Sequence, residues 1–467
     1  MTIDNVRRAL DTATTNHFSV FLRRVMATVA PAAPYAHNWH IDAIGAYLQA
    51  CAKGEIRRLI INLPPRMLKS TTVSVAWPAW LLGHQPTIKI MAASYAQALA
   101  TKHSLDCRIV MQSEWYRRVF PRTILSHEQN EKDRFATTAQ GQRLAVSVGG
   151  AAIGEGGHIL IVDDPLSPLQ ALHATQRDAA NAWFDHSFAT RLDDKQHGAI
   201  VVVMQRLHGD DLSGYLRRKG GWEHLSLPAI APKKTVIQLG DFRYARAAGE
   251  ALHEAREPLW LLERTKQELG SANFQAQYQQ APLRDEGSVI KAHWLRRFDA
   301  LPEGGVIVQS WDTAIKAGAQ HDASACATFL QKDGEHYLID LQSVRLEYPE
   351  LKRRIVEHAA RHAPEVILME DKASGQSLLQ DLRRETSLPL LPCMPQGDKT
   401  MRLVRISPLI EAGRLHLPKH APWLADCETQ LLQFPHAAHD DMVDAISQYF
   451  NWVRTRHQRA KPNMRRL

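Results

Sequence analysis

The sequence predicts an α/β protein with two sheet-containing domains in succession. Four short apolar runs separated by long helical stretches indicate a parallel sheet, and they are Arg58–Leu63, Thr87–Ser94, His158–Val162 and Ala199–Met204. Three later runs joined by short turns indicate antiparallel strands, and they are Val306–Trp311, Ala323–Leu330 and His336–Leu341. The length of 467 residues accommodates two or three hydrophobic cores.

Changes in this pattern define five segments. An amphipathic helix from His17 to Val29 precedes the first strand, and a Gln-rich helix at Phe274–Gln280 follows the fourth in a Pro- and Gly-containing stretch. A helix over Tyr348–His362, a strand over Glu365–Glu370 and a last helix over Asp440–Val453 complete the second domain. We expect an N-terminal arm over 1–34, a first α/β domain over 35–227, a subdomain and linker over 228–303, a second α/β domain over 304–453 and a basic tail over 454–467.

The composition is that of an ordinary globular protein. An apolar content of 45% with 23% charged residues excludes wholesale disorder and a fibrous architecture. The 57 Lys and Arg residues exceed the 49 Asp and Glu residues, and the net charge of +8 suits a polyanionic partner. Five scattered cysteines without a C-x-x-C pair argue against a disulfide framework or a zinc ribbon. With no signal-peptide pattern and no long apolar stretch, we expect a soluble, cytoplasmic protein.

A phosphate-binding loop follows the first predicted strand. The strand leads through Pro64-Pro65-Arg66 into Lys69-Ser70 at the start of a helix. Backbone N–H groups and the helix dipole can hold phosphates there, while Lys69 neutralises their oxygens and Ser70 offers a hydroxyl to Mg²⁺. Leu63 and Leu68 occupy the two glycine positions of the pattern G-x-x-x-x-G-K-[ST], so the motif alone equally fits an ordinary strand–turn–helix.

Polar residues at two further strand ends support the nucleotide site. Asp163 and Asp164 end the third strand, where the first can hold Mg²⁺ and the second can polarise the attacking water. Gln205 follows the next strand at the same sheet edge and would lie close to the γ-phosphate. The alternatives are that Asp164-Pro165 only begins a turn and that Gln205 belongs to a surface loop.

A second set of acids marks the C-terminal domain. Asp312 and Glu370 end two strands, and Asp440, Asp441 and Asp444 lie at the start of the last helix. Carboxylates from separate elements can bridge two Mg²⁺ or Mn²⁺ ions about 4 Å apart for phosphodiester cleavage. The strand order fits a ribonuclease H-like fold. Each acid taken singly also fits a helix cap or a solvated surface group.

Together these motifs resemble the large terminase subunit of tailed bacteriophages, from about residue 34 to 450. The similar stretches are 54–70, the Val-Asp-Asp-Pro run ending at Pro165, 204–212, 277–280, 311–313, 370–375 and 439–445. The resemblance implies a P-loop (ASCE-type) ATPase domain with a parallel sheet, followed by a ribonuclease H-like nuclease domain. It implies ATP-driven movement of double-stranded DNA into a procapsid and metal-dependent cutting of concatemeric DNA.

The resemblance also assigns roles by position. The residues that bind the nucleotide and its Mg²⁺ would be Arg66, Lys69, Ser70, Thr71 and Asp163. Those that serve catalysis and coupling in the ATPase would be Asp164 and Gln205. The ligands of the nuclease metals, Mg²⁺ or Mn²⁺, would be Asp312, Glu370 and Asp441, with Asp440 and Asp444 nearby. Trp39-His40 falls where the family contacts adenine, and Arg143 is a candidate for an arginine supplied to a neighbouring subunit. Lys399 and Arg402 are candidate DNA-phosphate contacts near the nuclease.

The implied partners are double-stranded DNA, a portal protein, a small terminase subunit and further copies of the chain in a ring, in the cytoplasm of an infected or lysogenic bacterium. Two departures stand out: Leu68 replaces a glycine, and Asp164 stands where many members have Glu. Two alternatives therefore remain open at this point. One is a helicase or repair-type ATPase with an appended nuclease, and the other is an ATPase-inactive prophage remnant that acts as a docking subunit.

Overall fold

The computed structural model describes residues 3–150, 154–282, 289–313, 323–371, 373–435, 437 and 439–460. The chain divides into two compact units, 1–266 with 271–285 and 267–270 with 286–467. The division falls inside the segment that the sequence predicts as subdomain and linker. Of the predicted basic tail, 461–467 lie outside the described residues. None of the helices in the described ranges has the length and apolar character that a membrane crossing requires.

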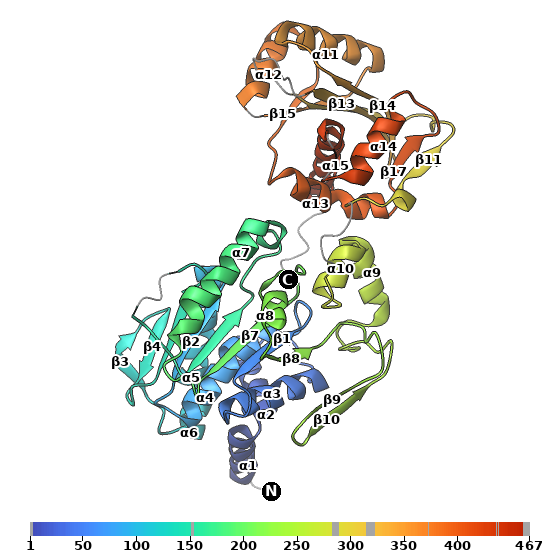
Figure 1. Cartoon of the computed structure of the whole chain (residues 1–467). Coiled ribbons are helices and arrows are strands. Elements are labelled where there is room, and N and C mark those ends of the chain that lie inside the picture. Colours follow the sequence, from blue (N-terminus) through green and yellow to red (C-terminus); the bar gives the residue numbers. More distant parts are fainter. Residues whose placement is uncertain are drawn as a thin grey trace. The chain divides into compact units, whose positions relative to one another are not determined.

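An eight-stranded sheet in the order β3-β4-β5-β2-β6-β7-β1-β8 forms the centre of the first unit (Figure 1). Its strands are β1 (Arg58–Asn62), β2 (Lys89–Ser94), β3 (Leu125–Asn130), β4 (Arg134–Thr137), β5 (Gln142–Ser147), β6 (Ile159–Asp163), β7 (Ala199–Met204) and β8 (Glu223–Ser226). The strands from β5 to β8 in this order are parallel, whereas β3 and β4 form an antiparallel edge. The predicted parallel sheet is therefore confirmed.

Helices cover both faces of this sheet. They are α1 (Ile3–Asn16), α2 (Phe18–Val29), α3 (Trp39–Ala52), α4 (Trp77–His84), α5 (Gln97–Gln112), α6 (Glu114–Val119), α7 (Ala174–Trp183) and α8 (Leu212–Lys219). Side chains from α2 to α6 pack on one face, and side chains from α7 and α8 pack on the other. Such covering explains why the central strands are apolar throughout.

Helix α2 lies within the segment expected to form an N-terminal arm, yet it belongs to the core of the first unit. Phe21 and Leu22 are fully buried, and the Phe21 ring makes edge contacts with Trp80 of α4 and Trp115 of α6. An aromatic cluster of this kind withdraws a large apolar area from water and gains from ring geometry. The amphipathic pattern of α2 thus reflects packing within the unit.

The first unit also contains a hairpin and a helix pair after β8. They comprise β9 (Thr235–Leu239), β10 (Phe242–Arg246), α9 (Leu259–Leu269) and α10 (Ser271–Gln277). The last residues of α9, from 267 on, are assigned to the second unit. A small separate core forms here from Ala229, Ala251, Leu262 and Phe274. The stretch is tied to the large sheet by the backbone bond from Leu227 N–H to Asn62 C=O (2.8 Å).

A seven-stranded sheet in the order β11-β17-β14-β13-β12-β15-β16 forms the second unit. Its strands are β11 (Arg296–Phe298), β12 (Val306–Asp312), β13 (Ser324–Lys332), β14 (Glu335–Val344), β15 (Val366–Glu370), β16 (Leu390–Cys393) and β17 (Leu415–Pro418). As predicted, β12, β13 and β14 pair antiparallel, and β15 joins β12 in parallel. That pairing places Asp312 and Glu370 at the same edge of the sheet.

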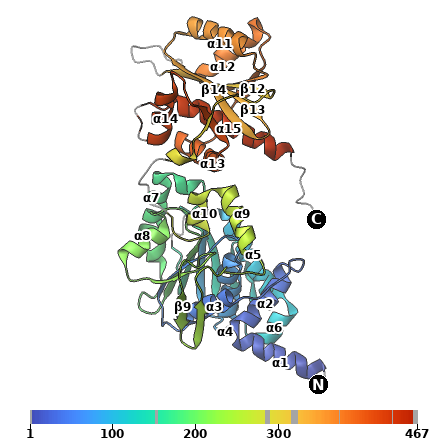
Figure 2. The ribbon, with the colours of Figure 1, turned by 90° about the vertical axis from the view of Figure 1, so that its right-hand side faces the viewer.

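Two layers of helices enclose the second sheet (Figure 2). The helices are α11 (Tyr348–His362), α12 (Ala373–Glu385), α13 (Lys399–Glu411), α14 (Leu424–Gln433) and α15 (Asp441–Ala460). Residues of α11 and α12 pack with Trp311 on one face, while α13, α14 and α15 pack with Val308 on the other. Because side chains alternate along a strand, Asp312 points to the face that carries α15.

Helix α15 is fixed to the sheet by an aromatic contact. The rings of Phe329 in β13 and Tyr449 in α15 stack at 3.8 Å with an angle of 8°, and both residues are fully buried. The Tyr449 hydroxyl also bonds to His336 Nδ1 (2.8 Å). These contacts position the first turn of α15, which carries Asp441 and Asp444.

Replacing Phe329 by Ala should destabilise the second unit by about 3–5 kcal/mol, because the change opens a cavity under α15. Calorimetry of the full chain would measure the loss as a lowered unfolding transition. Val356→Ala removes apolar atoms from an α11 position that is 37% exposed and should cost less than about 0.5 kcal/mol. Equal losses in the two variants would contradict the packing role of Phe329.

Candidate functional site

The loop that the sequence predicts to bind phosphate turns through left-handed residues, although leucines occupy its two glycine positions. Leu63 directly follows β1, is fully buried and needs no left-handed backbone. Leu68, by contrast, has a φ of 63°, and Arg66 has a φ of 64°. A left-handed residue other than glycine costs about 1–2 kcal/mol, which the surrounding contacts must offset. Leu68 thus adopts the left-handed backbone conformation that glycine adopts without steric cost.

Lys69 faces the two strand-end acids. Its ammonium Nζ lies 2.9 Å from Asp164 Oδ2, and its side chain is 10% exposed. Burial alone would lower the pKa of Lys69, but Asp164 and Asp163 outweigh that effect and raise it. Lys69 is thus a retained cation at the carboxyl end of the sheet. The loop after β1 and the end of β6 therefore lie at the same edge of the sheet, as the sequence predicts.

Asp163 is held by hydroxyl groups from the segment after the loop. Ser70 Oγ donates to Asp163 Oδ1 (3.0 Å), and Ser74 Oγ donates to Asp163 Oδ2 (2.7 Å). Burial raises the pKa of Asp163, while Lys69 and these two hydroxyls act in the opposite direction. Ser74 lies in a π-helical stretch, Thr71–Ala76, that continues as α4. The sequence motif identifies Ser70 but not Ser74, because the latter depends on that helical geometry.

Arg143 occupies an unexpected place beneath this site. It is fully buried in β5, where its Nη2 donates to the Ser74 carbonyl (2.9 Å). A side chain enclosed in its own core cannot be presented to a neighbouring subunit, which corrects our expectation for it. The guanidinium instead contributes positive charge that lowers the pKa of Asp163 against the effect of burial. His103 Nδ1 lies 3.5 Å from the same carboxylate, and burial lowers the pKa of His103 to about 4.

Asp164 connects the loop to the next strand end. Besides its contact with Lys69, its Oδ1 accepts a hydrogen bond from the backbone N–H of Gln205 (3.2 Å). Asp164 has a φ of 45°, which re-aims its side chain where β6 ends. Gln205 therefore lies beside the acid through its backbone. Of the other expected residues, Thr71 starts the π-helical stretch, whereas Arg66 is exposed on the loop.

Trp39 and His40 differ from each other in exposure. The Trp39 ring stacks on Tyr244 of β10 at 4.1 Å with an angle of 6°, so one of its faces is already covered. Arg246 also lies over the Trp39 ring at 5.7 Å. His40 is buried, and burial lowers its pKa to about 3. Nothing in these contacts reaches the acids that face the loop.

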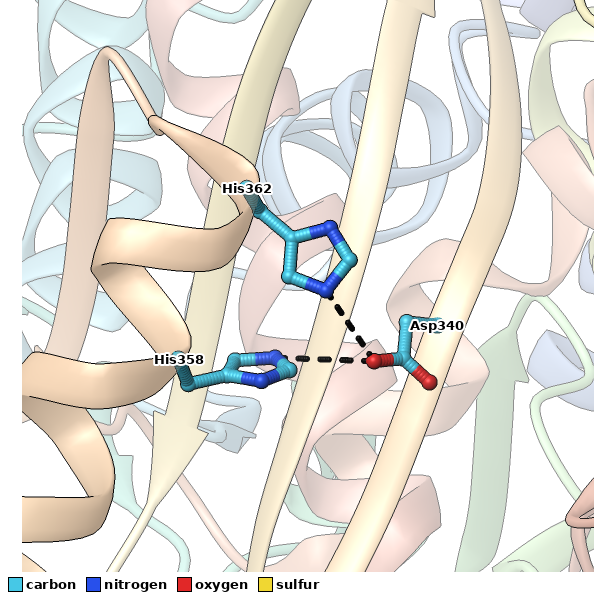
Figure 3. A group of neighbouring side chains, drawn as sticks. All are labelled: Asp340, His358 and His362. Atoms are coloured by element: carbon cyan, nitrogen blue, oxygen red, sulfur yellow. Dashed lines mark hydrogen bonds and ion pairs between the residues drawn. The ribbon is translucent and has the colours of Figure 1, made fainter.

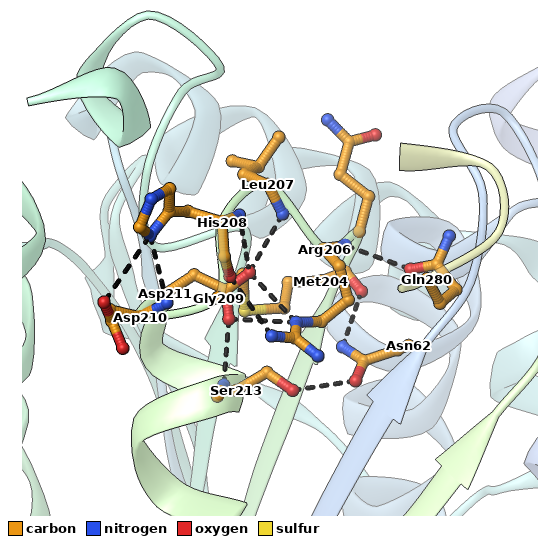
Figure 4. Close-up of polar contacts among 12 residues, drawn as sticks. Asn62, Met204, Arg206, Leu207, His208, Gly209, Asp210, Asp211, Ser213 and Gln280 are labelled. Atoms are coloured by element: carbon orange, nitrogen blue, oxygen red, sulfur yellow. Dashed lines mark hydrogen bonds and ion pairs between the residues drawn. The ribbon is translucent and has the colours of Figure 1, made fainter. Parts of the chain in front are cut away.

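A buried ion pair follows Gln205 in the chain. Arg206 Nε lies 3.0 Å from both oxygens of Asp211, and Asp211 also accepts N–H bonds from Leu207, His208 and Gly214 (Figure 4). Asp211 is the N-cap of α8. The backbone N–H of Arg206 donates to Gln280 Oε1 (3.0 Å), beyond α10. The end of β7 is therefore linked both to α8 and to the stretch after α10, a network that the sequence motif did not reveal.

Asn62 completes this network from the end of β1. Its Nδ2 donates to the Met204 carbonyl (3.0 Å), and its Oδ1 accepts from Ser213 Oγ (2.7 Å) and lies 2.8 Å from His224 Nε2. The residue thus joins β1, β7 and α8 directly below the phosphate-binding loop. A buried amide with all these partners makes the sheet edge rigid.

In the second unit, Asp312, Glu370 and Asp444 come together. Burial together with Asp444 and Glu370 raises the pKa of Asp312 well above its ordinary value. Asp444 has a 5% exposed side chain, and its own pKa is also raised by burial. Carboxylates that cluster in this way fit a divalent cation, which relieves their repulsion.

Two cations from α13 compensate this acid cluster. Lys399 Nζ lies 2.6 Å from Asp440 Oδ1 and 2.8 Å from Asp444 Oδ2. Arg402 Nη2 lies 2.7 Å from Asp444 Oδ1, and its Nη1 lies 3.8 Å from Glu370 Oε2. The two residues that the sequence suggested as phosphate contacts therefore pair with the acids in this structure.

The last expected acid, Asp441, lies at the start of the helix that carries Asp444. It is the first residue of α15 and lines a pocket with Ala323, Ser343 and Arg345. It lies one helical turn before Asp444 on the same helix. The sequence predicts Asp441 as a metal ligand and Asp444 only as a nearby acid, whereas the structure places Asp444 beside Asp312 and Glu370.

Comparisons with known proteins agree with this architecture. Residues 309–451 match the family model of the terminase RNaseH-like domain. The large terminase of a thermophilic bacteriophage, in crystal form 2, is 9% identical with a TM-score of 0.50, and the match covers 87% of this chain and 98% of that chain. The complex of the same terminase with ADP gives 10% identity, a TM-score of 0.49 and coverage of 86% and 98%.

A further structure, the large terminase of bacteriophage HK97, is 13% identical with a TM-score of 0.36 over 92% of this chain and 99% of that chain. No curated protein matches the chain. The chain thus has the fold of a large terminase, with an RNase H-like terminase domain in its C-terminal part.

Asp211→Asn should destabilise the first unit by about 3–5 kcal/mol, because it leaves the Arg206 charge buried without a counter-charge. Thermal unfolding of the full chain measures the loss. Asp210→Asn is the matched control, since Asp210 is 52% exposed and its ion pair with Arg218 is worth about 0–1 kcal/mol. A similar small effect of both changes would show that the buried pair does not hold the end of β7.

Proposed function

We propose that this chain is the large terminase subunit of a tailed bacteriophage or prophage, a motor that uses ATP to move double-stranded DNA into a procapsid and cuts concatemeric DNA. The observation that carries this proposal is the pairing of two charge-compensated acid sites at strand ends within one chain. One faces the lysine of a phosphate-binding loop. The other lies in the part that matches the terminase RNase H-like family model.

The first site suits ATP with Mg²⁺. We assign the phosphates to the backbone of the loop, to Lys69 and to Arg66, whose exposed position leaves it able to reach a ligand. Ser70 and Asp163 supply the oxygen groups for the magnesium ion, and Thr71 belongs with the residues that bind the nucleotide. When bound, that ion neutralises charge on the phosphate oxygens. The large terminase of the thermophilic bacteriophage, whose fold this chain shares, has been solved with ADP.

Asp164 and Gln205 carry out the hydrolytic and coupling roles in this proposal. With phosphate bound, Lys69 has a stronger anion to contact, which releases Asp164 to orient the attacking water. The backbone N–H of Gln205 follows the position of that carboxylate because it donates a 3.2 Å hydrogen bond to it. A movement of Asp164 would shift the backbone of Gln205 and, through it, Arg206, which bonds with Asp211 and Gln280.

The second site suits DNA cleavage with two divalent cations, Mg²⁺ or Mn²⁺. Asp312, Glu370 and Asp444 provide the carboxylates, and Asp440 and Asp441 extend the acidic edge. Such cations activate water and stabilise the leaving oxygen when they are bound. Lys399 and Arg402 then lose part of their hold on the acids and can contact the DNA phosphates.

Partners follow from this role. We propose double-stranded DNA, a portal protein, a small terminase subunit and further copies of the chain in a ring, in the cytoplasm of the bacterial host. The net charge of +8 predicts that DNA binding weakens as salt concentration rises.

Steady-state ATP hydrolysis with and without duplex DNA tests the motor. Lys69→Ala should abolish hydrolysis, since the phosphates and Asp164 lose the buried ammonium that faces them from the loop. Lys102→Ala removes an ammonium whose side chain is 66% exposed in the same unit and should leave the rate unchanged. Equal, negligible rates in wild type and Lys69→Ala would favour the docking subunit over the motor.

Cleavage of duplex DNA with Mg²⁺ or Mn²⁺ tests the nuclease. Asp312→Asn and Asp444→Asn should each reduce cleavage by on the order of 100-fold or more and leave ATP hydrolysis intact. Asp299→Asn, a change of equal charge at a 74% exposed position of the same unit, serves as the control. Normal cutting by Asp312→Asn would refute the assignment of the nuclease site.

A further inference from the structure

A second possible metal site lies in the nuclease unit, away from the acid cluster. Asp340 of β14 and His358 and His362 of α11 offer three ligand atoms within 4.8 Å of one another. Within the described ranges, these three ligand atoms lie close enough together to share one ion. In Figure 3 both imidazoles point toward the same carboxylate oxygen.

The distances show a converging set of donors. Asp340 Oδ2 lies 3.1 Å from His362 Nε2 and 3.9 Å from His358 Nε2. The two histidines are four residues apart in α11, so they lie on the same helix face. Two imidazoles and one carboxylate form the ligand set of many sites for zinc and related transition metals, in which water completes the coordination.

Outer contacts hold the Asp340 carboxylate and the α11 backbone at His358 in place. The backbone N–H of Leu341 donates to Asp340 Oδ1 (2.9 Å), which leaves Oδ2 directed at the histidines. Gln309 Nε2 donates to the His358 carbonyl (3.2 Å), whereas Thr328 Oγ1 lies 3.0 Å from His358 Nε2 and occupies the position that an ion bound to this nitrogen takes over. Partners that orient the ligands are a regular feature of metal sites.

This group is distinct from the proposed nuclease site because the two lie on opposite faces of the sheet. Asp340 pairs with Thr328 across β13, and Thr328 pairs with Gln309 of β12. Gln309 contacts α11, whereas Asp312, three residues on, points to the face that carries α15. Three residues along a strand also separate the two groups by about 10 Å.

The accessibility of the group allows an ion to enter. The side chains of Asp340 and His362 are 28% and 18% exposed, while His358 is 2% exposed. His358 therefore fixes the group on its buried side, while Asp340 and His362 remain accessible to an ion from solvent.

We infer that Asp340, His358 and His362 bind one transition-metal cation of the zinc class and that water completes its coordination. Both Nε2 atoms must then give their lone pairs to the ion, so each ring proton resides on Nδ1. The bound ion would join the last turn of α11 to the middle of β14. Its role is therefore to stabilise the nuclease unit, and it depends on neither the ATPase nor the nuclease assignment.

Equilibrium dialysis of the full chain against Zn²⁺, with millimolar Mg²⁺ present, tests this inference by elemental analysis. We expect one Zn²⁺ per chain in wild type and in Asp312→Asn. His362→Ala and Asp340→Asn should each lower the affinity at least tenfold, on the order expected when one of few ligands is lost. Both changes lie at partly exposed positions, which protects the fold.

His416→Ala is the matched control. His416 Nε2 pairs with Glu335 Oε2 at 2.8 Å in the same unit but belongs to no group of three such ligands within the described ranges. This variant should keep its Zn²⁺. Zn²⁺ should also raise the melting temperature of wild type by a few degrees and leave that of His362→Ala unchanged.

Two results would overturn the inference. One is a wild type that retains no more Zn²⁺ than His362→Ala. The other is loss of Zn²⁺ in Asp312→Asn with retention in His362→Ala, which would assign the ion to the acid cluster. Co²⁺ in place of Zn²⁺ adds a spectroscopic criterion, because the visible bands of a site with imidazole ligands should disappear in His362→Ala.

Discussion

Buried carboxylates at the carboxyl ends of strands determine how both units are built. Removing a carboxylate from water costs several kcal/mol unless a cation and hydrogen-bond donors lie close by. In the first unit the acids of β6 are compensated by Lys69 from the loop and by Arg143 from β5. In the second unit Lys399 and Arg402 of α13 pair with Asp444 of α15, beside the strand-end acids, and Arg402 also lies 3.8 Å from Glu370 at the end of β15. Each compensating residue comes from an element that the fold must bring to the same sheet edge.

This arrangement explains why binding and conformational change can be connected. A phosphate or a divalent cation competes for the same charges that now pair within the chain. Lys69 cannot contact Asp164 and a phosphate equally well, and Asp444 cannot keep both cations of α13 once a metal ion is bound. Ligand binding therefore redistributes a fixed set of charges. In the proposed function, the network from Gln205 through Arg206 to Gln280 is the route by which such a redistribution reaches another segment.

Much of this architecture could be predicted from local patterns. Apolar runs identified the central strands, and Lys69, Asp163 and Asp312 stood out because strand ends concentrate chemistry in α/β folds. Arg143, Ser74 and the Arg206–Asp211 pair could not be recognised in this way. Their roles depend on contacts between residues far apart in the chain or on a π-helical turn. Edge strands such as β3 and β4 were missed because they lack a long apolar run.

The choice between Asp441 and Asp444 shows the same limit at finer scale. Spacing puts both near one helix face, and only the packing of α15 on the sheet distinguishes the partner of Asp312. His358 and His362 did carry a local signal, an i, i+4 pair on a helix. Asp340, their partner, lies in another element, so the sequence alone does not single out the group.

Leu68 has a consequence for the entropy of the phosphate-binding loop. Glycine visits many backbone conformations in the unfolded chain, whereas leucine visits few, so less freedom remains to be lost when this loop orders. The side chain of Leu68 also packs partly against the core of the first unit. In the proposed nucleotide site, a stiffer loop loses less conformational entropy on binding, at the expense of local strain in the φ angle of Leu68. The loop of this chain is therefore less adaptable than a glycine-rich loop, but it is already close to one conformation before a ligand binds.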